Sequence, residues 1–569
     1  MRGDGKLAKA SLADRVKLAA LTGAHRLAPI AHATLSPARA FGRLRARAPE
    51  RLLIAPQDIR TADATRADDI YAGYFAFGGR IVNTQGRSPF DLPAPSPDWR
   101  SALNGFGWLR HLRAANTALA RANARALVED YLAGRRRFAT NAEPDPATAA
   151  RRILSWLSQS TLLLEGADSE FYSRFLRTLS RDAVQLQQDY GASSGLTRLQ
   201  AAVALAEYAL CADLPPRHQA RATSQLAAAI DEQVLPDGGH IGRNPQTLIE
   251  LLLDFLPLRQ SYAARALAAP PTLLNAIDRI MPALRLLRHG EGSLALFNGM
   301  GVTAPDRLAV VLAYDDARGQ ALTSAPYAGY QRLEAGEAVA IVDCGPPPPR
   351  PFSRHAHAGC LSFEFSSGAD RIVVNCGAPA LTAAHAQAAR HTAAHSTLVI
   401  DDTSSCRIAG EAGIERVVAG QIVAGPNRVE VARRDMPEGA LLDTSHDGYA
   451  RNFGLVHERR LALRSDGAQL AGEDRLIDSG QPAQIRPRTF AIRFHIHPSV
   501  TITGSADDAG VALDLPGGKR WMFEAQGASI AVEESVFFAS PNGARACQQI
   551  VARGDAETAT CVQWSFSLT

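Results

Sequence analysis

Residues 353–401 read SRHAHAGCLSFEFSSGADRIVVNCGAPALTAAHAQAARHTAAHSTLVID, and this segment contains the main signals for the fold and the chemistry that we expect. Five of the chain's 15 histidines fall within it: His355, His357, His385, His391 and His395. Two runs inside it, LSFEF and RIVVN, are typical of strands. Because side chains alternate between the two faces of a strand, we predict that His355 and His357 project from one face of an extended segment.

His395 opens another β-rich run, HSTLVID, which we expect to return to the same face on a neighbouring antiparallel strand. Three imidazoles, or two imidazoles and an oxygen donor, are a ligand set that Zn²⁺ favours, and a spare imidazole beside them is a usual proton-transfer group. A single histidine is more often a packed or surface residue, so the prediction depends on the clustering. His385 and His391 lie in an Ala-rich segment that we interpret as a surface loop or helix.

The composition indicates a globular protein with a large core. A chain of 569 residues is long enough for two or three domains. Its net charge of +4 is small for this length, so it does not indicate a nucleic-acid binder, although a modest excess of cations suits an acidic polysaccharide. The seven cysteines include no CxxC pair, which argues against a disulfide framework or a four-cysteine zinc site.

The N-terminus is basic, and we assign residues 1–70 to an N-terminal extension that is either disordered or packed, with contact to an anionic membrane surface as the alternative. Its short apolar run LAALTG is followed at once by His25 and Arg26, which does not fit a secretory signal. No run of 18 or more apolar residues occurs, so we expect no membrane span. The absence of a signal favours the cytoplasm.

We assign residues 71–322 to a helical domain, in which apolar residues recur at intervals of three and four from about residue 100 to residue 320, in segments rich in Ala, Leu and Arg. A succession of helical hairpins of this length predicts a toroid or solenoid of packed helices. The segment PDGGHIGRNP, residues 236–245, interrupts the helices and displays His240, Arg243 and Asn244 on a loop. A second glycine-rich loop, residues 288–301, presents His289, Glu291 and Asn298.

The pattern changes from residue 323 to residue 569. Short β-branched runs alternate with turns, and this spacing predicts a large antiparallel β-sandwich. We therefore predict an α+β multidomain protein: an N-terminal (α/α) toroid of helical hairpins followed by a C-terminal antiparallel β-sandwich.

The order of HAHAGCLSFEF, RIVVNCG and RHTAAHSTLVID behind a helical region that begins WRSALNGFGWLRHL resembles the heparinase II/III family of polysaccharide lyases. The resemblance covers most of the chain. It implies cleavage of uronate-containing glycans by β-elimination in a cleft between toroid and sandwich, and an envelope or periplasmic setting. In this family's pattern His355 matches a catalytic histidine, and His357 and His395 match zinc-binding histidines.

Two positions depart from the family's pattern. The acidic zinc ligand is replaced by Asn375, which leaves His357, His395 and Asn375 as the ligand set of a structural zinc ion. The tyrosine that serves as proton donor or base is missing after residues 236–245, where the chain reads Pro245-Gln246-Thr247.

β-Elimination beside a uronate needs a group that neutralises the carboxylate, a base and an acid, and fixed donors or cations stabilise the enolate-like transition state best. We hypothesise that Arg243, Asn244 and Gln246 bind the carboxylate, whereas His355 and His240 share the base and acid roles. The alternative is a catalytically silent glycan-binding or envelope-associated protein that retains the lyase fold. A homodimer is compatible with either.

Overall fold

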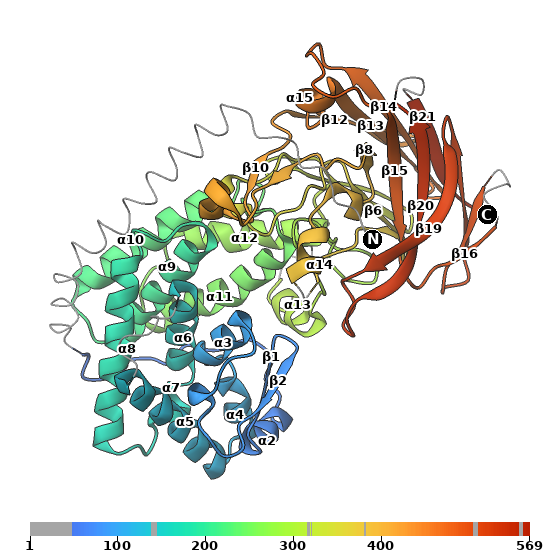
Figure 1. Ribbon diagram of the computed structural model, residues 1–569. Helices are drawn as coiled ribbons and strands as arrows, with labels where there is room; N and C mark the ends of the chain where they lie inside the picture. The colour runs from blue at the N-terminus through green and yellow to red at the C-terminus, as the bar shows by residue number, and fades with distance from the viewer. Residues whose placement is uncertain are drawn as a thin grey trace.

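The computed structural model describes residues 48–137, 145–315, 319, 321–379, 383–504, 510–556 and 561–569. A helical region precedes a β-sandwich, which confirms the predicted α+β architecture (Figure 1). Residues 1–47 of the predicted extension lie outside the described residues. The chain from residue 48 onward packs on the helical region, where Leu53 N donates to Cys211 O.

The helices of the first region pack on one another as a toroid of hairpins, with α9 between α6, α10 and α11. The described helices are α2 (Thr65–Tyr71), α3 (Pro97–Asn104), α4 (Leu109–Ala115), α5 (Ala118–Arg137), α6 (Pro146–Ser158), α7 (Ser160–Leu164), α8 (Ser169–Asp189), α9 (Gly195–Cys211), α10 (Pro216–Gln233), α11 (Pro245–Ala264), α12 (Pro271–Leu286) and α13 (Pro305–Leu312), with a hairpin of β1 (Tyr74–Phe77) and β2 (Arg80–Asn83) between α2 and α3.

Capping residues fix where several helices begin. The Asp145 side chain accepts from Ala147 N and Thr148 N at the start of α6, and Asn244 does the same for Gln246 N at the start of α11. Each cap precedes a proline at the first helical position, where the missing N–H costs nothing. The loop 236–245 therefore ends at a well-defined helix terminus.

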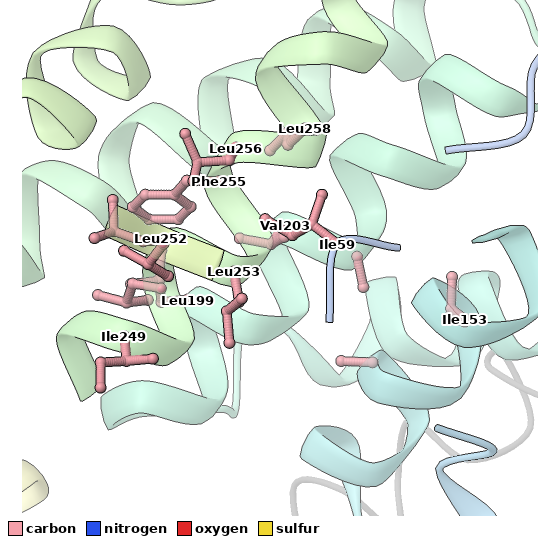
Figure 2. Packing of buried hydrophobic residues seen from close by; sticks show 14 of the residues in the cluster. Ile59, Ile153, Leu199, Val203, Ile249, Leu252, Leu253, Phe255, Leu256 and Leu258 are labelled. Atoms are coloured by element: carbon pink, nitrogen blue, oxygen red, sulfur yellow. The ribbon is translucent and has the colours of Figure 1, made fainter. Parts of the chain in front are cut away.

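The helical core is built from aliphatic side chains of α6, α9 and α11, with Ile59 from the preceding segment (Figure 2). Leu199, Leu252 and Phe255 are fully buried in it. Since α9 and α11 are apolar on nearly all sides, they form the centre of the toroid and hold the loops at their ends in place.

The β-sandwich consists of two large antiparallel sheets. One has the strand order β11-β12-β13-β14-β21-β18-β17-β16, and the other has the order β19-β20-β15-β7-β6-β5-β4-β3 with β8 paired to β15. The strands are β3 (Ser324–Ala325), β4 (Tyr330–Ala335), β5 (Ala338–Asp343), β6 (Phe363–Ser367), β7 (Asp370–Val374), β8 (Leu398–Ile400), β9 (Arg407–Ile408), β10 (Ile422–Ala424), β11 (Val429–Met436), β12 (Gly439–His446), β13 (Leu455–Arg464), β14 (Gln469–Asp478), β15 (Thr489–Ile496), β16 (Thr501–Thr503), β17 (Val511–Asp514), β18 (Arg520–Gln526), β19 (Ser529–Phe537), β20 (Arg545–Asp555) and β21 (Cys561–Leu568), accompanied by the short helices α14 (Ala383–Ala388) and α15 (Ala450–Phe453).

The sheet that contains β4, β5 and β6 lies against the helical region. Arg332 of β4 donates to Leu286 O, at the end of α12, and to Arg288 O, two residues beyond it. All seven cysteines are free thiols, and five of them are buried, in agreement with the absence of a disulfide pattern in the sequence. Among the helices of the described residues, none is both long and apolar enough to cross a bilayer.

Candidate functional site

His355 and His357 lie in a loop, not in a strand. The chain from residue 353 to residue 362 is irregular, and the strand predicted from LSFEF begins at Phe363. Consequently the two histidines do not share a face: His355 is exposed, whereas His357 is buried. The prediction that strand periodicity places these imidazoles side by side is wrong, because period two applies only to extended backbone that is paired in a sheet.

His357 and His395 do meet, as predicted. Nδ1 of His357 lies 3.0 Å from Nε2 of His395, and both side chains are buried. His395 Nδ1 lies 2.9 Å from the carbonyl oxygen of His391, so Nδ1 carries its proton and Nε2 accepts the proton of His357 Nδ1. Burial lowers the pKa of His395 to about 4, and burial, followed by the neighbouring His395, lowers the pKa of His357 well below its usual value. Both rings are therefore neutral near pH 7.

Asn375 lies next to this pair but turns its amide to other partners. Its Oδ1 accepts from Ser396 N at 2.9 Å, and its Nδ2 donates to Glu364 Oε1 at 3.3 Å. Glu364 Oε1 also accepts from Asn375 N, and Glu364 Oε2 lies 3.0 Å from His289 Nε2. Asn375 thus joins the end of β7 to β6 and to the segment before β8.

This set of donors does not fit a resident zinc ion. Protein zinc sites take three or four nitrogen, sulfur or oxygen ligands around one point. Here two imidazole nitrogens share one proton between them, and the amide oxygen of Asn375 is occupied by a backbone N–H. Among the described residues no three His, Cys, Asp or Glu side chains converge on a possible metal position. His357 and His395 therefore form a hydrogen-bonded pair of neutral imidazoles.

His240 is buried in loop 236–245 rather than displayed on it. Its Nδ1 accepts from Gly242 N at 2.9 Å, and its Nε2 lies 3.3 Å from Gln233 Oε1. Nε2 therefore carries the proton, and both ring nitrogens are engaged in local contacts. Burial lowers the pKa of His240 to about 4. These contacts stabilise the loop and leave His240 without a free nitrogen for the predicted acid–base role.

Arg243 is a buried brace between the two regions. Nε donates to Ala328 O, one terminal nitrogen donates to Gly345 O and Pro346 O, and the other donates to Gly329 O and Asp343. All five guanidinium N–H groups are thus used. The Asp343 carboxylate opposes the effect of burial and raises the pKa of Arg243, so the charge is retained. The expectation that Arg243 binds a substrate carboxylate does not agree with these contacts.

The backbone of Arg243 has an unusual conformation. Its φ of +61° lies in the left-handed region, which costs a residue with a Cβ roughly 1–2 kcal/mol. The five hydrogen bonds hold it there. Tyr330 packs its ring 4.9 Å from the guanidinium carbon and donates its hydroxyl proton to Arg243 O. Tyr330 is itself buried, and burial raises its pKa, so it does not replace the missing catalytic tyrosine.

Asn244, Gln246 and His355 lie closer to the surface. Asn244 caps α11, and Gln246 Nε2 lies 3.3 Å from Glu250 Oε1 one turn further along the same helix. Gly299 lies between two of these residues. A Cβ atom at this position would lie 3.2 Å from Asn244 Nδ2 and 3.4 Å from His355 Cβ. Loss of hydration, followed by the charges of Arg390 and Arg354, lowers the pKa of His355.

The loop 236–245 does face the histidine-bearing segment, as the sequence predicted. The rings of His240 and Phe352 are 5.9 Å apart, and the site at Gly299 joins Asn244 to His355. Residues that the sequence did not single out complete this junction. Asp343 binds both Arg243 and Asn298, and Glu364 binds His289. The glycine-rich loop 288–301 was a signal for Asn298 and His289, but nothing in the pattern of β5 or β6 marks their acidic partners.

Comparison with known proteins agrees with this architecture. The family model described as "Heparinase II/III-like, C-terminal" matches residues 317–565. FtsZ-localized protein C of Caulobacter vibrioides is 32% identical over 536 residues, which cover 91% of this chain and 90% of that protein. The chain therefore belongs to the heparinase II/III-like family.

Solved lyase structures share the fold. A crystal structure of heparinase III superposes with a TM-score of 0.64 at 13% identity, covering 86% of this chain and 79% of that chain. The heparan sulfate lyase HepC from Pedobacter heparinus gives a TM-score of 0.59 at 15% identity, with coverage of 93% and 87%. At this level of identity the two structures establish the shared fold alone.

Proposed function

We propose that this chain is a catalytically silent member of its family, which retains the lyase fold and acts through binding. The observation that carries the proposal is the set of contacts around Arg243, whose five N–H groups are donated to protein acceptors. β-Elimination requires fixed positive charge or donors at the uronate carboxylate. A guanidinium that is buried and fully paired supplies neither.

The histidines support the same proposal. His240 uses one ring nitrogen within its own loop and the other toward Gln233 at the end of α10, and His357 and His395 are hydrogen-bonded to each other. A general base works best with a pKa near the working pH, whereas burial holds the pKa of His240 and of His395 at about 4. Tyr330, which packs against Arg243, is buried and so does not supply an accessible phenol in place of the missing tyrosine.

The similarity to FtsZ-localized protein C suggests where such a binding protein acts. We propose that this chain, too, is recruited to the place in the cell where FtsZ assembles. A fluorescent fusion of the full chain, produced in Caulobacter vibrioides together with labelled FtsZ, tests this directly. We expect a band that coincides with FtsZ, whereas the fluorescent protein alone stays diffuse. Diffuse signal from the fusion would reject the proposed recruitment.

A polysaccharide lyase acting on a uronic-acid glycan is the second candidate, favoured by one observation. His355 is exposed and lies beside Asn244 at Gly299, so one imidazole and one amide reach the surface at the junction. The His355→Ala variant tests it in an assay for unsaturated uronate products. Activity that is present in the wild type, lost in His355→Ala and retained in the exposed control His385→Ala would establish this candidate over the silent one.

A further inference from the structure

The edge strand β11 (Val429–Met436) is long and regular and has one unpaired edge. It pairs with β12 through eight consecutive residue pairs without a bulge, and it contains no proline. No described residue forms a backbone hydrogen bond to its other edge. Six of its eight residues are exposed, among them Val431 and Met436. Natural sheets usually protect such an edge with a bulge, a proline, charged side chains or a cover, and of these β11 has the charged side chains.

The pairing with β12 determines which residues face the free edge. Asp447 N donates to Arg428 O, so Arg428 bonds toward the β12 side. In an antiparallel pair every second residue directs its N–H and C=O groups to the same neighbouring strand. Since Arg428 bonds toward β12, the even-numbered residues of β11 also direct these groups to β12. The N–H and C=O groups of Val429, Val431, Arg433 and Asp435 point to the unpaired edge.

We propose that β11 is a self-association edge, which pairs in antiparallel orientation with β11 of a second copy of this chain. A twofold axis at Ala432 places Val431 opposite Arg433 of the second copy, and both of these residues present free backbone groups. The same axis places Glu430 of each copy opposite Arg434 of the other, which gives two pairs of opposite charge. This register joins the two eight-stranded sheets into one continuous sheet.

Charge selects this register over its neighbours. Only shifts of two residues keep the free backbone groups facing one another, because each single-residue shift turns the paired groups away. Moving the axis to Val431 places Arg428 opposite Arg434 of the second copy, and moving it to Arg433 places Glu430 opposite Met436. Like charges directly opposite each other destabilise a sheet, whereas opposite charges stabilise it. The axis at Ala432 is the arrangement with two favourable pairs and no repulsive one.

A second copy fits this edge better than an unrelated strand because the charges complement themselves. With the axis at Ala432, Glu430 of each copy lies opposite Arg434 of the other, whereas Arg433 and Asp435 pair with each other within the strand. The proposal does not depend on whether the chain is silent or a lyase, since β11 lies in the sheet that does not contain β4, β5 and β6.

Sedimentation equilibrium of the full chain tests the proposal. Edge pairing without a large apolar face gives modest affinity, so we expect a dissociation constant of about 1–50 µM. The Val431→Pro variant removes one free-edge N–H without removing a bond to β12, and we expect it to be monomeric. The matched control Val431→Thr keeps the N–H and should remain dimeric. A wild-type chain that is monomeric well above this concentration range would overturn the proposal.

Charge reversal tests the register. Glu430→Arg alone and Arg434→Glu alone should each weaken dimerisation by at least about tenfold, because each places like charges opposite one another twice. A mixture of the two single variants should dimerise again, since every pair then has opposite charges. Circular dichroism checks that each variant is folded. Dimerisation that is unchanged by both reversals and by Val431→Pro would place the interface elsewhere and reject the inference.

Discussion

At the scale of single residues, burial decides what the candidate site can do. His240, His357 and His395 have the side-chain chemistry of a catalytic or metal site, yet each is enclosed and hydrogen-bonded inside the protein. The residue types were predictable from the sequence. Their burial was not, because no local pattern tells an interior histidine from one that lines a cleft.

The depressed histidine pKa values predict acid sensitivity. An unfolded histidine titrates near 6.5, whereas the pKa of His240 and of His395 is about 4 in the folded chain because of burial. Between these values the unfolded state binds the proton and the folded state does not, so stability falls as the pH drops from about 6.5 toward 4. Above about pH 6.5 both histidines are neutral in the folded and in the unfolded state, so they do not lower the unfolding free energy there.

Urea denaturation as a function of pH measures this effect. The His240→Gln variant keeps hydrogen-bonding capacity but cannot be protonated, so we expect a shallower loss of stability below pH 6.5 than in the wild type. His385→Gln, at an exposed position, should leave the slope unchanged. An equal slope for all three proteins would show that His240 does not carry the predicted cost.

Metal content is the second prediction at this scale. Because the His357–His395 pair shares a proton and Asn375 is engaged with Ser396, we expect the purified protein to contain far less than one zinc ion per chain. Elemental analysis after gel filtration in zinc-containing buffer measures it. One zinc per chain that is lost in both His357→Ala and His395→Ala would contradict this account.

At the scale of elements, the alternation of polar and apolar residues was informative where the backbone is regular. The runs LSFEF, RIVVN and HSTLVID predicted β6, β7 and β8 with shifts of a few residues at their ends. The same reasoning failed for residues 353–362, which contain no β-branched run and form a loop. The loop position of His240, Arg243 and Asn244 was predicted from glycine and proline, but those residues do not indicate which way side chains turn.

Asn244 was predicted to bind substrate, but its side chain stabilises the start of a helix instead. Its side chain caps α11, and replacing such a cap by alanine costs about 1 kcal/mol of stability. We therefore expect Asn244→Ala to lower the thermal midpoint and Asn244→Asp to preserve it. Gln246→Ala, which removes only a contact within the helix, should cost a few tenths of a kcal/mol at about the level of other surface pairs. A silent Asn244→Ala variant would refute the capping role.

At the scale of the whole molecule, the helical region and the sandwich are joined by buried polar contacts. Arg243 and Asp343 lie 100 residues apart in the sequence and form the centre of this junction. His289 with Glu364, and Arg332 with the end of α12, add further contacts. A sequence pattern without an alignment contains no signal for such long-range pairs.

The Arg243–Asp343 pair should therefore control the stability of the junction. Removing one partner of a buried ion pair leaves an uncompensated charge and typically costs about 3–5 kcal/mol. We expect this loss for Asp343→Asn in chemical denaturation. The control Asp514→Asn removes a carboxylate from the exposed ion pair with Arg520 and should cost less than about 1 kcal/mol. Equal stability of the two variants would mean that the junction does not depend on this pair.

The central claim is that the lyase fold is retained here without the chemistry of β-elimination. The most direct measurement is a long incubation of the purified wild-type chain with a panel of uronic-acid glycans, followed by ultraviolet absorbance and mass spectrometry of the products. We predict no unsaturated uronate above the level of a heat-denatured sample. An unsaturated product that accumulates in proportion to enzyme concentration would contradict the claim and establish the chain as a lyase.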